Sequence, residues 1–343
     1  MDMIKRQVNS SKRAIFGILI GLSAGLLLVS LTLGRYPITP GEVLRVLLSP
    51  IFPKLAIGIP EVARRLILLV RLPRILAALL IGASFGGTGT AFQAIFKNPL
   101  VDSNILGVTS GAGFGAALAL LLMGTGWQVQ FSAFLFGLAA VSLAFAGSRL
   151  YKTTPLLVLT LMGILIGSLF SSLTALIKYV ADPLDTLPAI TFWLLGSLAS
   201  ITWEKIGLLA VITVSGLILL WLVRWRLNVL SLGEVEAQSL GMNPTQLKLI
   251  IIIISTLMTA SAVSVSGVIG WVGLIIPHAG RLLVGPDHKY LLPVSVNLGG
   301  IFLLLIDNIA RTLLPGEIPL GVLTGLIGVP IFIVLLRRKQ TGW

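Results

Sequence analysis

Two histidines, the only ones in the chain, could form a metal site with a neighbouring carboxylate. His278 and His288 flank a glycine-containing turn, PHAGRLLVGPDH, in which Asp287 supplies the carboxylate. Imidazole and carboxylate groups bind zinc when several of them converge on one ion. The separation of the two histidines does not match the short ligand spacings of known metal motifs. An intramembrane metalloenzyme is therefore the weakest hypothesis, and a polar helix terminus at His288 and Asp287 is the stronger one.

Asp307 is the clear case of an ionisable residue inside a long apolar run, LLLIDNIAR, and Arg311 follows it on the same helical face. Ionisable residues inside membrane spans are candidates for ion pathways. Proton-coupled transporters use several buried carboxylates as relays, whereas this run offers one, with an arginine beside it. The pattern predicts an Asp307–Arg311 ion pair. It disfavours an ion-coupled secondary transporter, which stays the alternative function.

The sequence has no motif for an energy source of its own. It lacks the G-x-x-x-x-G-K-[ST] loop that cradles ATP phosphates, and it also lacks G-x-S-x-G, H-E-x-x-H and any cysteine. We therefore expect no catalytic residue, no metal site and no cofactor in this chain. The energy for transport must then come from a partner.

The elements that position these residues follow from composition. The chain has 343 residues, of which 56% are hydrophobic and 11% charged, and its mean hydropathy is +1.03. Soluble domains carry about 25% charged residues. In lipid, only helices and closed barrels satisfy every backbone polar group, and the apolar runs here are continuous rather than alternating. We predict an all-α integral membrane protein, a polytopic bundle of about ten transmembrane helices in a single permease domain over residues 1–343.

Ten apolar runs are long enough to approach the roughly 20 residues that a membrane-spanning helix needs. They lie near residues 14–34, 67–92, 105–124, 128–148, 155–180, 206–223, 247–266, 268–283, 291–310 and 318–336. An even number of spans puts both termini on one side. Glycines recur every four residues at Gly17, Gly21 and Gly25 and again at Gly82 and Gly86, which predicts close helix packing in lipid.

The basic residues between the spans indicate the orientation. Most of the 25 Lys and Arg residues fall on the side of the termini, which favours that side as cytoplasmic. Most of the opposing charges lie in the segment 35–74, a concentration that needs its own explanation. The net charge of +13 resides in these loops and does not form the basic face of a nucleic-acid-binding domain.

Two segments on the other side are too polar or too broken to span. The loop 35–66 contains TPGEVLRVLL, where Thr39 as N-cap and Pro40 in the first turn predict a short surface helix. The segment 181–205 is interrupted by prolines, so we interpret it as an amphipathic stretch near the outer surface.

The most polar inner loop, at about residues 228–246, contains LSLGEVEAQSLGMN. A short helix is predicted to start at Glu234, to carry Ala237 and Leu240 on one side, and to end at Gly241 as a C-cap. A short amphipathic helix of this kind suits docking into a groove of another protein. An ordinary interfacial helix is the alternative.

With these motifs in order along nearly the whole chain, the sequence closely resembles the iron-chelate and cobalamin permease family, the transmembrane subunits of type II ABC importers. The stretches that carry the resemblance are RLPRILAALLIGASFGGTGTAFQAIFKNPLVDSNILGVTSGAGFG, LSLGEVEAQSLGMN, GVIGWVGLIIPHAGRLLVGPDHKYLLP, DNIAR and EIPLGVLTGLIGVPIF. The departure at Trp271, where the family more often has phenylalanine, keeps the aromatic bulk.

The resemblance implies a complex. It consists of two permease copies, as a homodimer or a heterodimer of similar chains, with two cytosolic ATPase subunits that use ATP and Mg and an extracytoplasmic substrate-binding protein. The location implied is a bacterial or archaeal cytoplasmic membrane, with both termini cytoplasmic. The implied substrate is a ferric siderophore or a related metal chelate such as haem or cobalamin. An oxyanion such as molybdate is a further candidate.

The resemblance also implies roles for individual residues. By this resemblance, Arg71, Arg74 and Arg311 are the residues that dock the binding protein, and Asp307 also holds Arg311 in place. The ATPase coupling helix is carried over to Glu234, Glu236, Ala237, Leu240 and Gly241. Asn98 and Leu100 in FKNPLVD match the inner gate of the translocation path. Thr153 and Thr154 match the gate region more loosely. Arg64 and Arg65 match no family position but are expected to add to electrostatic steering.

Overall fold

The computed structural model of the chain describes residues 2–149 and 156–337, and all regular structure in them is helical. The long helices are α1 (Asp2–Thr32), α4 (Leu72–Phe96), α6 (Trp127–Arg149), α7 (Leu156–Val180), α9 (Trp203–Leu232), α11 (Pro244–Ser266), α13 (His288–Thr312) and α14 (Leu320–Arg337). The shorter ones are α2 (Pro40–Leu48), η1 (Pro53–Ala56), α3 (Glu61–Arg65), η2 (Leu66–Arg71), η3 (Ser103–Leu106), α5 (Val108–Met123), α8 (Thr186–Leu195), α10 (Glu234–Ser239) and α12 (Val272–Val284).

Eight helices in the described residues are long and apolar enough to cross a bilayer, so the predicted all-α membrane bundle is confirmed. The third and eighth predicted spans are the apolar helices α5 and α12, with 16 and 13 residues. At 1.5 Å per residue they rise about 24 and 20 Å, less than the roughly 30 Å hydrocarbon core. Within the stretch 181–205, α8 has only ten residues, which agrees with a segment that does not span.

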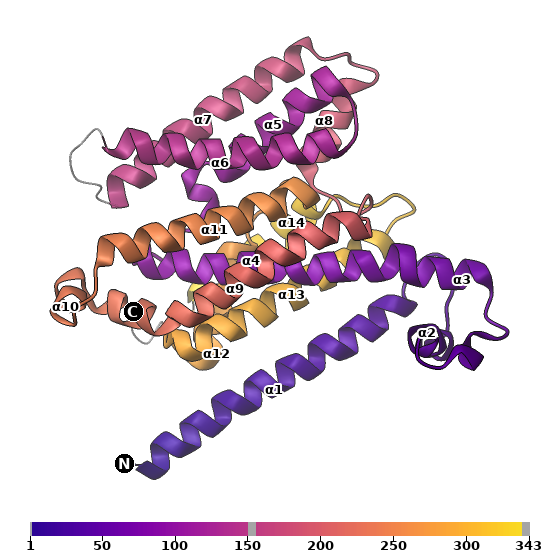
Figure 1. Cartoon of the computed structure of the whole chain (residues 1–343), viewed down its shortest axis with the longest axis horizontal. Coiled ribbons are helices and arrows are strands. Elements are labelled where there is room, and N and C mark those ends of the chain that lie inside the picture. Colours follow the sequence, from indigo (N-terminus) through magenta and orange to yellow (C-terminus); the bar gives the residue numbers. More distant parts are fainter. Residues whose placement is uncertain (1, 150–155, 338–343) are drawn as a thin grey trace.

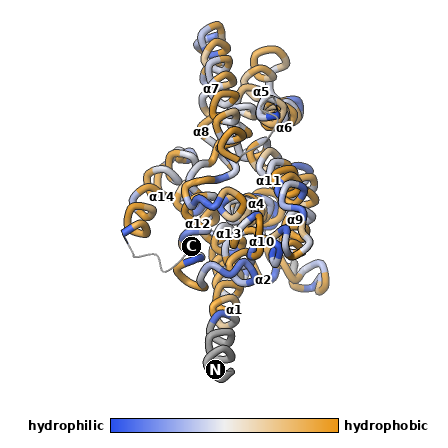
Figure 2. The backbone as a smooth tube through the Cα atoms, turned by 90° about the vertical axis from the view of Figure 1, so that its left-hand side faces the viewer, coloured by the Kyte–Doolittle hydropathy of each residue, from blue (hydrophilic) through white to orange (hydrophobic). Residues whose placement is uncertain are grey.

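The helices surround α4, which runs through the middle of the molecule (Figure 1). The helices α9, α11, α12 and α13 pack along α4, and α1 packs against α13. The helices α5, α6 and α7 form a group on the opposite side from α1 (Figure 1). Hydrophobic residues run along most of the helices, the peripheral ones included (Figure 2), as a lipid-facing surface requires.

The two ends of the bundle carry different elements. The N-terminal part of α1, the helix α10 and the last turn of α14 lie at one end, which we call the α10 end (Figure 1). The helices α2 and α3 project from the opposite end, which we call the α2 end.

Small residues bring α4 and α13 into backbone contact. A Cβ atom added to Gly82 would lie 2.1 Å from the carbonyl oxygen of Gly299, and one added to Gly86 would lie 2.3 Å from that of Ser295. Such close approach supplies the van der Waals contact that holds helices together in lipid. The prediction is wrong for α1 within this chain, because Cβ atoms at Gly17, Gly21 and Gly25 would meet nothing within 4 Å.

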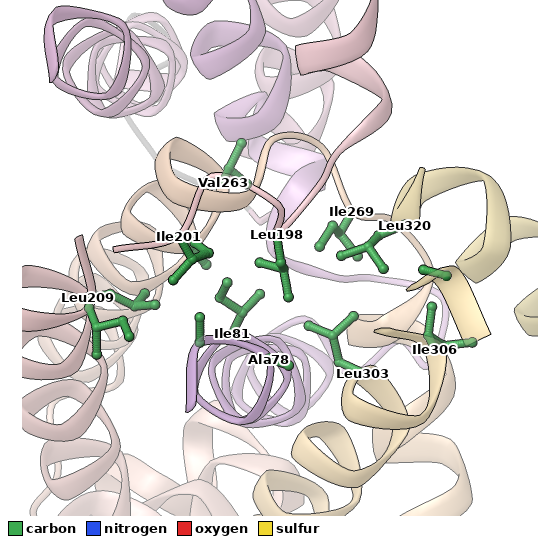
Figure 3. Packing of buried hydrophobic residues seen from close by; sticks show 14 of the residues in the cluster. Ala78, Ile81, Leu198, Ile201, Leu209, Val263, Ile269, Leu303, Ile306 and Leu320 are labelled. Atoms are coloured by element: carbon green, nitrogen blue, oxygen red, sulfur yellow. The ribbon is translucent and has the colours of Figure 1, made fainter. Parts of the chain in front are cut away.

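A hydrophobic core lies around the half of α4 nearer the α2 end. Its residues point toward one another from α4, α9, α11, α13, α14 and the loops that join them (Figure 3). The labelled members are Ala78, Ile81, Leu198, Ile201, Leu209, Val263, Ile269, Leu303, Ile306 and Leu320. This packing holds the middle of the bundle together, so that the polar residues at its two ends are kept in fixed positions.

The second predicted span is part of a continuous helical stretch from Glu61 to Phe96, longer than the predicted 67–92. Pro73 would normally break such a stretch, because it has no N–H to donate to the preceding turn. Here that turn is the π-helical segment η2, and the indole N–H of Trp203 donates to the carbonyl of Leu68 at 2.9 Å. The tertiary contact thus supplies a donor that the local sequence lacks.

The predicted surface helix at the α2 end is confirmed as α2. The backbone N–H of Thr39 donates to the Glu42 carboxylate at 2.7 Å, and the Thr39 hydroxyl accepts from the Glu42 backbone N–H at 3.3 Å. This is a capping box, with Pro40 in the first helical turn. The hydrogen bonds from Thr39 also lower the pKa of Glu42, because they stabilise its charged form.

Candidate functional site

The helix α10 forms where the sequence predicts it. It begins at Glu234 after Gly233, and Gly241 follows it with φ +75°, the left-handed conformation that favours glycine. Glu236 and Gly241 are both exposed. Gly241 ends the helix as predicted, one residue after the C-cap Leu240, and its N–H donates to the carbonyl of Gln238 at 2.9 Å.

The two apolar residues assigned to one side of α10 lie on different sides. Ala237 is fully buried within the chain, whereas Leu240 is 61% exposed. Ala237 is the inward anchor, because a small side chain lets α10 lie close to α9 and α11. Val235, which the sequence analysis did not single out, is 72% exposed. The exposed apolar patch of α10 therefore consists of Val235 and Leu240.

Two polar contacts tie α10 and its approach to the bundle. Glu234 forms a salt bridge with Lys248 in α11. Asn228, near the end of α9, accepts from the backbone N–H of His288 at 2.8 Å and donates to the Asp287 carboxylate at 2.7 Å. Asp287 caps α13 by accepting from the Lys289 N–H at 2.9 Å. The start of α13, which packs along α4, is thus joined directly to the helix that leads into α10.

The predicted gate loop follows α4. The side chain of Asn98 accepts from the backbone N–H of Leu100 at 2.9 Å, and both residues are exposed. Lys97 ends α4 in the left-handed conformation, with φ +48°. Asn98 thus holds the turn, and Leu100 presents 57% of its surface. Thr153 and Thr154, the other predicted gate residues, lie outside the described residues.

Arg71, at the α2 end, is buried rather than exposed. Its guanidinium donates to the carbonyls of Leu31 at 2.7 Å, Thr32 at 3.1 Å and Tyr36 at 2.5 Å. Leu31 and Thr32 are the last residues of α1, whose final turn has no basic residue of its own. A cation at a helix C-terminus satisfies orphan carbonyls and opposes the helix dipole. Arg71 therefore holds the end of α1.

Arg311 reaches the same helix end from α13. It donates to the carbonyls of Ser30 at 2.5 Å and Leu33 at 2.9 Å, and to the side chain of Asn308 at 2.6 Å. Asn308 in turn donates to the Ser30 hydroxyl at 2.7 Å. Two arginines that are distant in sequence therefore close the same end of α1.

Asp307 has a nearer partner than the predicted one. Its carboxylate lies 2.9 Å from Nε of Arg74 and 3.7 Å from Nε of Arg311. Arg74 also contacts Glu317, in the loop before α14, at 2.7 Å. Asp307 is fully buried and Arg74 is 7% exposed. This buried network ties α4, α13 and the approach to α14. Its central pair, Arg74 and Asp307, is not evident from the sequence, because the two residues are far apart along the chain.

The three arginines carried over for docking are thus buried and hydrogen-bonded inside the chain. Their docking role stays a prediction. The exposed cations of this end lie in the segment 35–65 and include Arg35, Arg45, Lys54, Arg64 and Arg65, of which Arg65 pairs with Glu61 at 2.9 Å.

The two histidines have separate partners. His278 lies against the Phe332 ring and 3.4 Å from the Leu335 carbonyl, both in α14. His288 lies 2.8 Å from Asn228 through Nδ1. Among the described residues, no group of three or more His, Cys, Asp or Glu side chains could hold a metal ion.

An open cavity of about 490 Å³, shallow and exposed at the surface, lies between α5 and α7. Its lining carries hydroxyl and amide groups but no charged side chain, and Ser171 and Ser110 contact across it at 3.3 Å. The polar lining residues are Asn104, Ser110, Ser168, Ser171 and Ser172. The arrangement can hydrogen-bond a polar molecule weakly without trapping it by charge.

Comparisons with known proteins agree with this architecture. A model of the FecCD transport family matches residues 20–338. The chain is 40% identical over 338 residues to the molybdate import system permease protein MolB of Haemophilus influenzae, covering 98% of both chains. It is 42% identical over 276 residues to a probable iron chelatin transport system permease protein of Helicobacter pylori, covering 80% of this chain and 83% of the relative.

The solved structures give the same result. An inward-facing conformation of a putative metal-chelate type ABC transporter matches with a TM-score of 0.85 and 40% identity, over 95% of this chain and 99% of that one. With a family match over most of the chain and relatives of this similarity, the chain belongs to the FecCD transport family and is a multi-pass permease subunit of an ABC importer.

Proposed function

We propose that this chain forms the transmembrane half of an importer that moves a ferric siderophore or a related metal chelate across the cytoplasmic membrane. Two copies surround a central path, the α10 end faces the cytoplasm with both termini, and separate ATPase subunits supply the energy. A binding protein delivers the substrate at the α2 end. The chain itself makes and breaks no bond in the substrate.

The observation that carries the proposal is the exposed apolar patch of α10. Val235 lies on α10 and Leu240 is its C-cap residue, and both are exposed beside acidic residues at one end of the bundle. Ala237 and the Glu234–Lys248 pair hold this helix on the chain. A short helix that is fixed on its inner side and exposes both apolar and acidic side chains suits the groove of a partner protein.

The proposal predicts that an ATPase subunit co-purifies with the tagged chain in mild detergent and is lost when both Val235 and Leu240 are replaced by Glu. Burying a charge in an apolar interface costs far more binding free energy than the replaced apolar contacts contribute. Thr245→Glu, an exposed position in the first turn of α11, is the matched control. Mass spectrometry of the purified complex is the measurement. Equal ATPase recovery from the double variant and the control would contradict the proposal.

The uncharged, hydroxyl-lined cavity of α5 and α7 supports a bulky chelate as substrate. Such ligands carry many oxygen atoms, which serine hydroxyls can contact without holding the ligand tightly. A compact dianion would favour fixed positive charge, and the lining of this cavity supplies none. The similarity to a molybdate permease makes molybdate the competing substrate. Uptake of labelled ferric siderophore and labelled molybdate by cells carrying the full importer distinguishes the two.

The burial of Arg71 and Arg74 changes how docking at the α2 end must be tested. Charge reversal at either residue also breaks the contacts that hold α1 or Asp307, so lost binding would have two explanations. Arg64→Glu avoids this problem, because Arg64 is exposed. We expect this variant to keep its thermal stability, to bind the binding protein more weakly, and to show less salt dependence in the binding that remains.

The control for docking is Arg149→Glu, an exposed arginine at the α10 end of α6. It changes the net charge equally but lies away from the α2 end. Binding measured over a series of salt concentrations decides the question. Unchanged affinity in Arg64→Glu would remove Arg64 from the docking surface, whereas equal weakening in both variants would show a net-charge effect.

A further inference from the structure

A second, larger cavity of about 930 Å³ lies near the α2 end, apart from the cavity of α5 and α7. Its walls are the first turns of α6 and α9, and α8 and the last turn of α11 also line it. Both α6 and α9 pack against α11. Phe131 on α6 and Leu208 on α9 line the cavity and are 58% and 63% exposed. Both helices are long and apolar enough to span a bilayer, so we expect an opening flanked by these residues to face lipid.

The deeper wall of this cavity is apolar. Phe134 comes from the second turn of α6, Val265 from the end of α11 and Leu120 from the end of α5. Cavities of this size with mostly apolar walls bind ligands whose apolar part they can cover. In a membrane, the apolar groups next to such an opening are the hydrocarbon chains of bilayer lipids.

Two charged side chains line the cavity, together with hydroxyl groups that include the buried Ser264 and Ser266 at the end of α11. Glu204 and Lys205 stand in the first turn of α9, and neither forms an ion pair with another described residue. The Lys205 ammonium donates to the carbonyl and the hydroxyl of Ser200, at 2.7 and 3.4 Å, which leaves one of its three donors. Trp127, the first residue of α6, lines the mouth and is 69% exposed. Tryptophans at helix ends mark the headgroup level of a bilayer.

We propose that this cavity binds one phospholipid with an ethanolamine headgroup. Its acyl chain lies against Phe131, Phe134 and Val265, its phosphate beside Lys205, and its ammonium beside Glu204. Adjacent side chains of opposite charge complement a zwitterion, whereas an anionic headgroup would meet Glu204 unfavourably. A choline headgroup has no N–H to donate to the carboxylate, so the site discriminates against it. The site does not depend on which substrate the importer carries.

The test uses the intact chain, purified with its native partners in mild detergent. Native mass spectrometry reports retained phospholipid, and the melting temperature is measured with added phosphatidylethanolamine, phosphatidylcholine or phosphatidylglycerol. We expect phosphatidylethanolamine to be retained and to raise the melting temperature most. Lys205→Glu, which puts two anions at the mouth, should reduce its retention about tenfold, the loss expected for a charge-assisted hydrogen bond.

Two further variants keep the test decisive. Leu208→Trp narrows the mouth at an exposed position and should also reduce retention, without introducing a charge. Lys54→Glu, an exposed lysine at the same end outside the cavity, should have no effect. Equal retention in Lys205→Glu and Lys54→Glu would overturn the proposal. So would equal stabilisation by all three lipids, or an intact complex that retains no phospholipid because a second copy covers the opening.

Discussion

Replacing Arg74 with methionine is expected to destabilise the folded chain by about 3–5 kcal/mol, the cost of leaving a buried charge without its partner. Asp307 is fully buried. In the variant, the nearest cation to its carboxylate is Arg311, which lies 3.7 Å away and already donates hydrogen bonds to the end of α1. Glu317 also loses its contact, which removes one of the interactions that hold the loop before α14. Thermal unfolding of the purified protein in detergent, followed by loss of monodisperse material, measures the effect.

Two comparisons separate this explanation from a general intolerance of substitution. Arg65→Met removes an arginine from an exposed ion pair with Glu61, and exposed pairs contribute little to stability. The double variant Arg74→Met with Asp307→Asn removes the orphaned charge and should recover part of the lost stability. Equal melting temperatures for Arg74→Met and Arg65→Met would show that the buried network does not hold the bundle together.

Replacing Asn228 with alanine is expected to uncouple ATP hydrolysis from transport. The change removes the acceptor of the His288 backbone N–H and one of the donors to the Asp287 carboxylate, which keeps its bond from the Lys289 N–H. It thereby breaks the direct link between the end of α9 and the start of α13. The exposed patch of α10 is untouched, so the ATPase should still bind. We expect transport per ATP hydrolysed to fall about tenfold, since losing one to two hydrogen bonds at a transmitting contact removes about 1–3 kcal/mol.

The measurement is substrate uptake and ATP hydrolysis in the same reconstituted vesicles. Ser231→Ala is the matched control, because Ser231 is exposed and its hydroxyl donates to the Asn228 carbonyl within its own helix. A loss of ATPase co-purification in Asn228→Ala would place the residue in partner binding instead. An unchanged ratio of uptake to hydrolysis would remove Asn228 from the coupling path.

The sequence was sufficient wherever local chemistry decides the outcome. Continuous apolar runs predict spanning helices because lipid offers no partner for an open backbone. Thr39 and Pro40 predict the start of α2, and Gly241 predicts the end of α10, since each satisfies a backbone requirement within a few residues. These elements appear where expected, including the short helix on which the partner proposal depends.

The sequence was not sufficient where the rotation of a helix about its axis, or a contact between distant residues, decides which side chains are buried and paired. A spanning helix is apolar on both its lipid side and its packed side, so periodicity does not show which residues point inward. For this reason Arg71 and Arg74 looked available but are buried, and Asp307 pairs more closely with Arg74 than with the nearby Arg311. On α10, six residues are too few to show that Ala237 turns inward and Val235 outward. The sequence by itself determined which segments are helices, because backbone satisfaction in lipid is a local demand, although helices such as α9 extend beyond the predicted bounds. Only the tertiary structure decided which polar side chains meet, because that depends on how those helices turn toward one another.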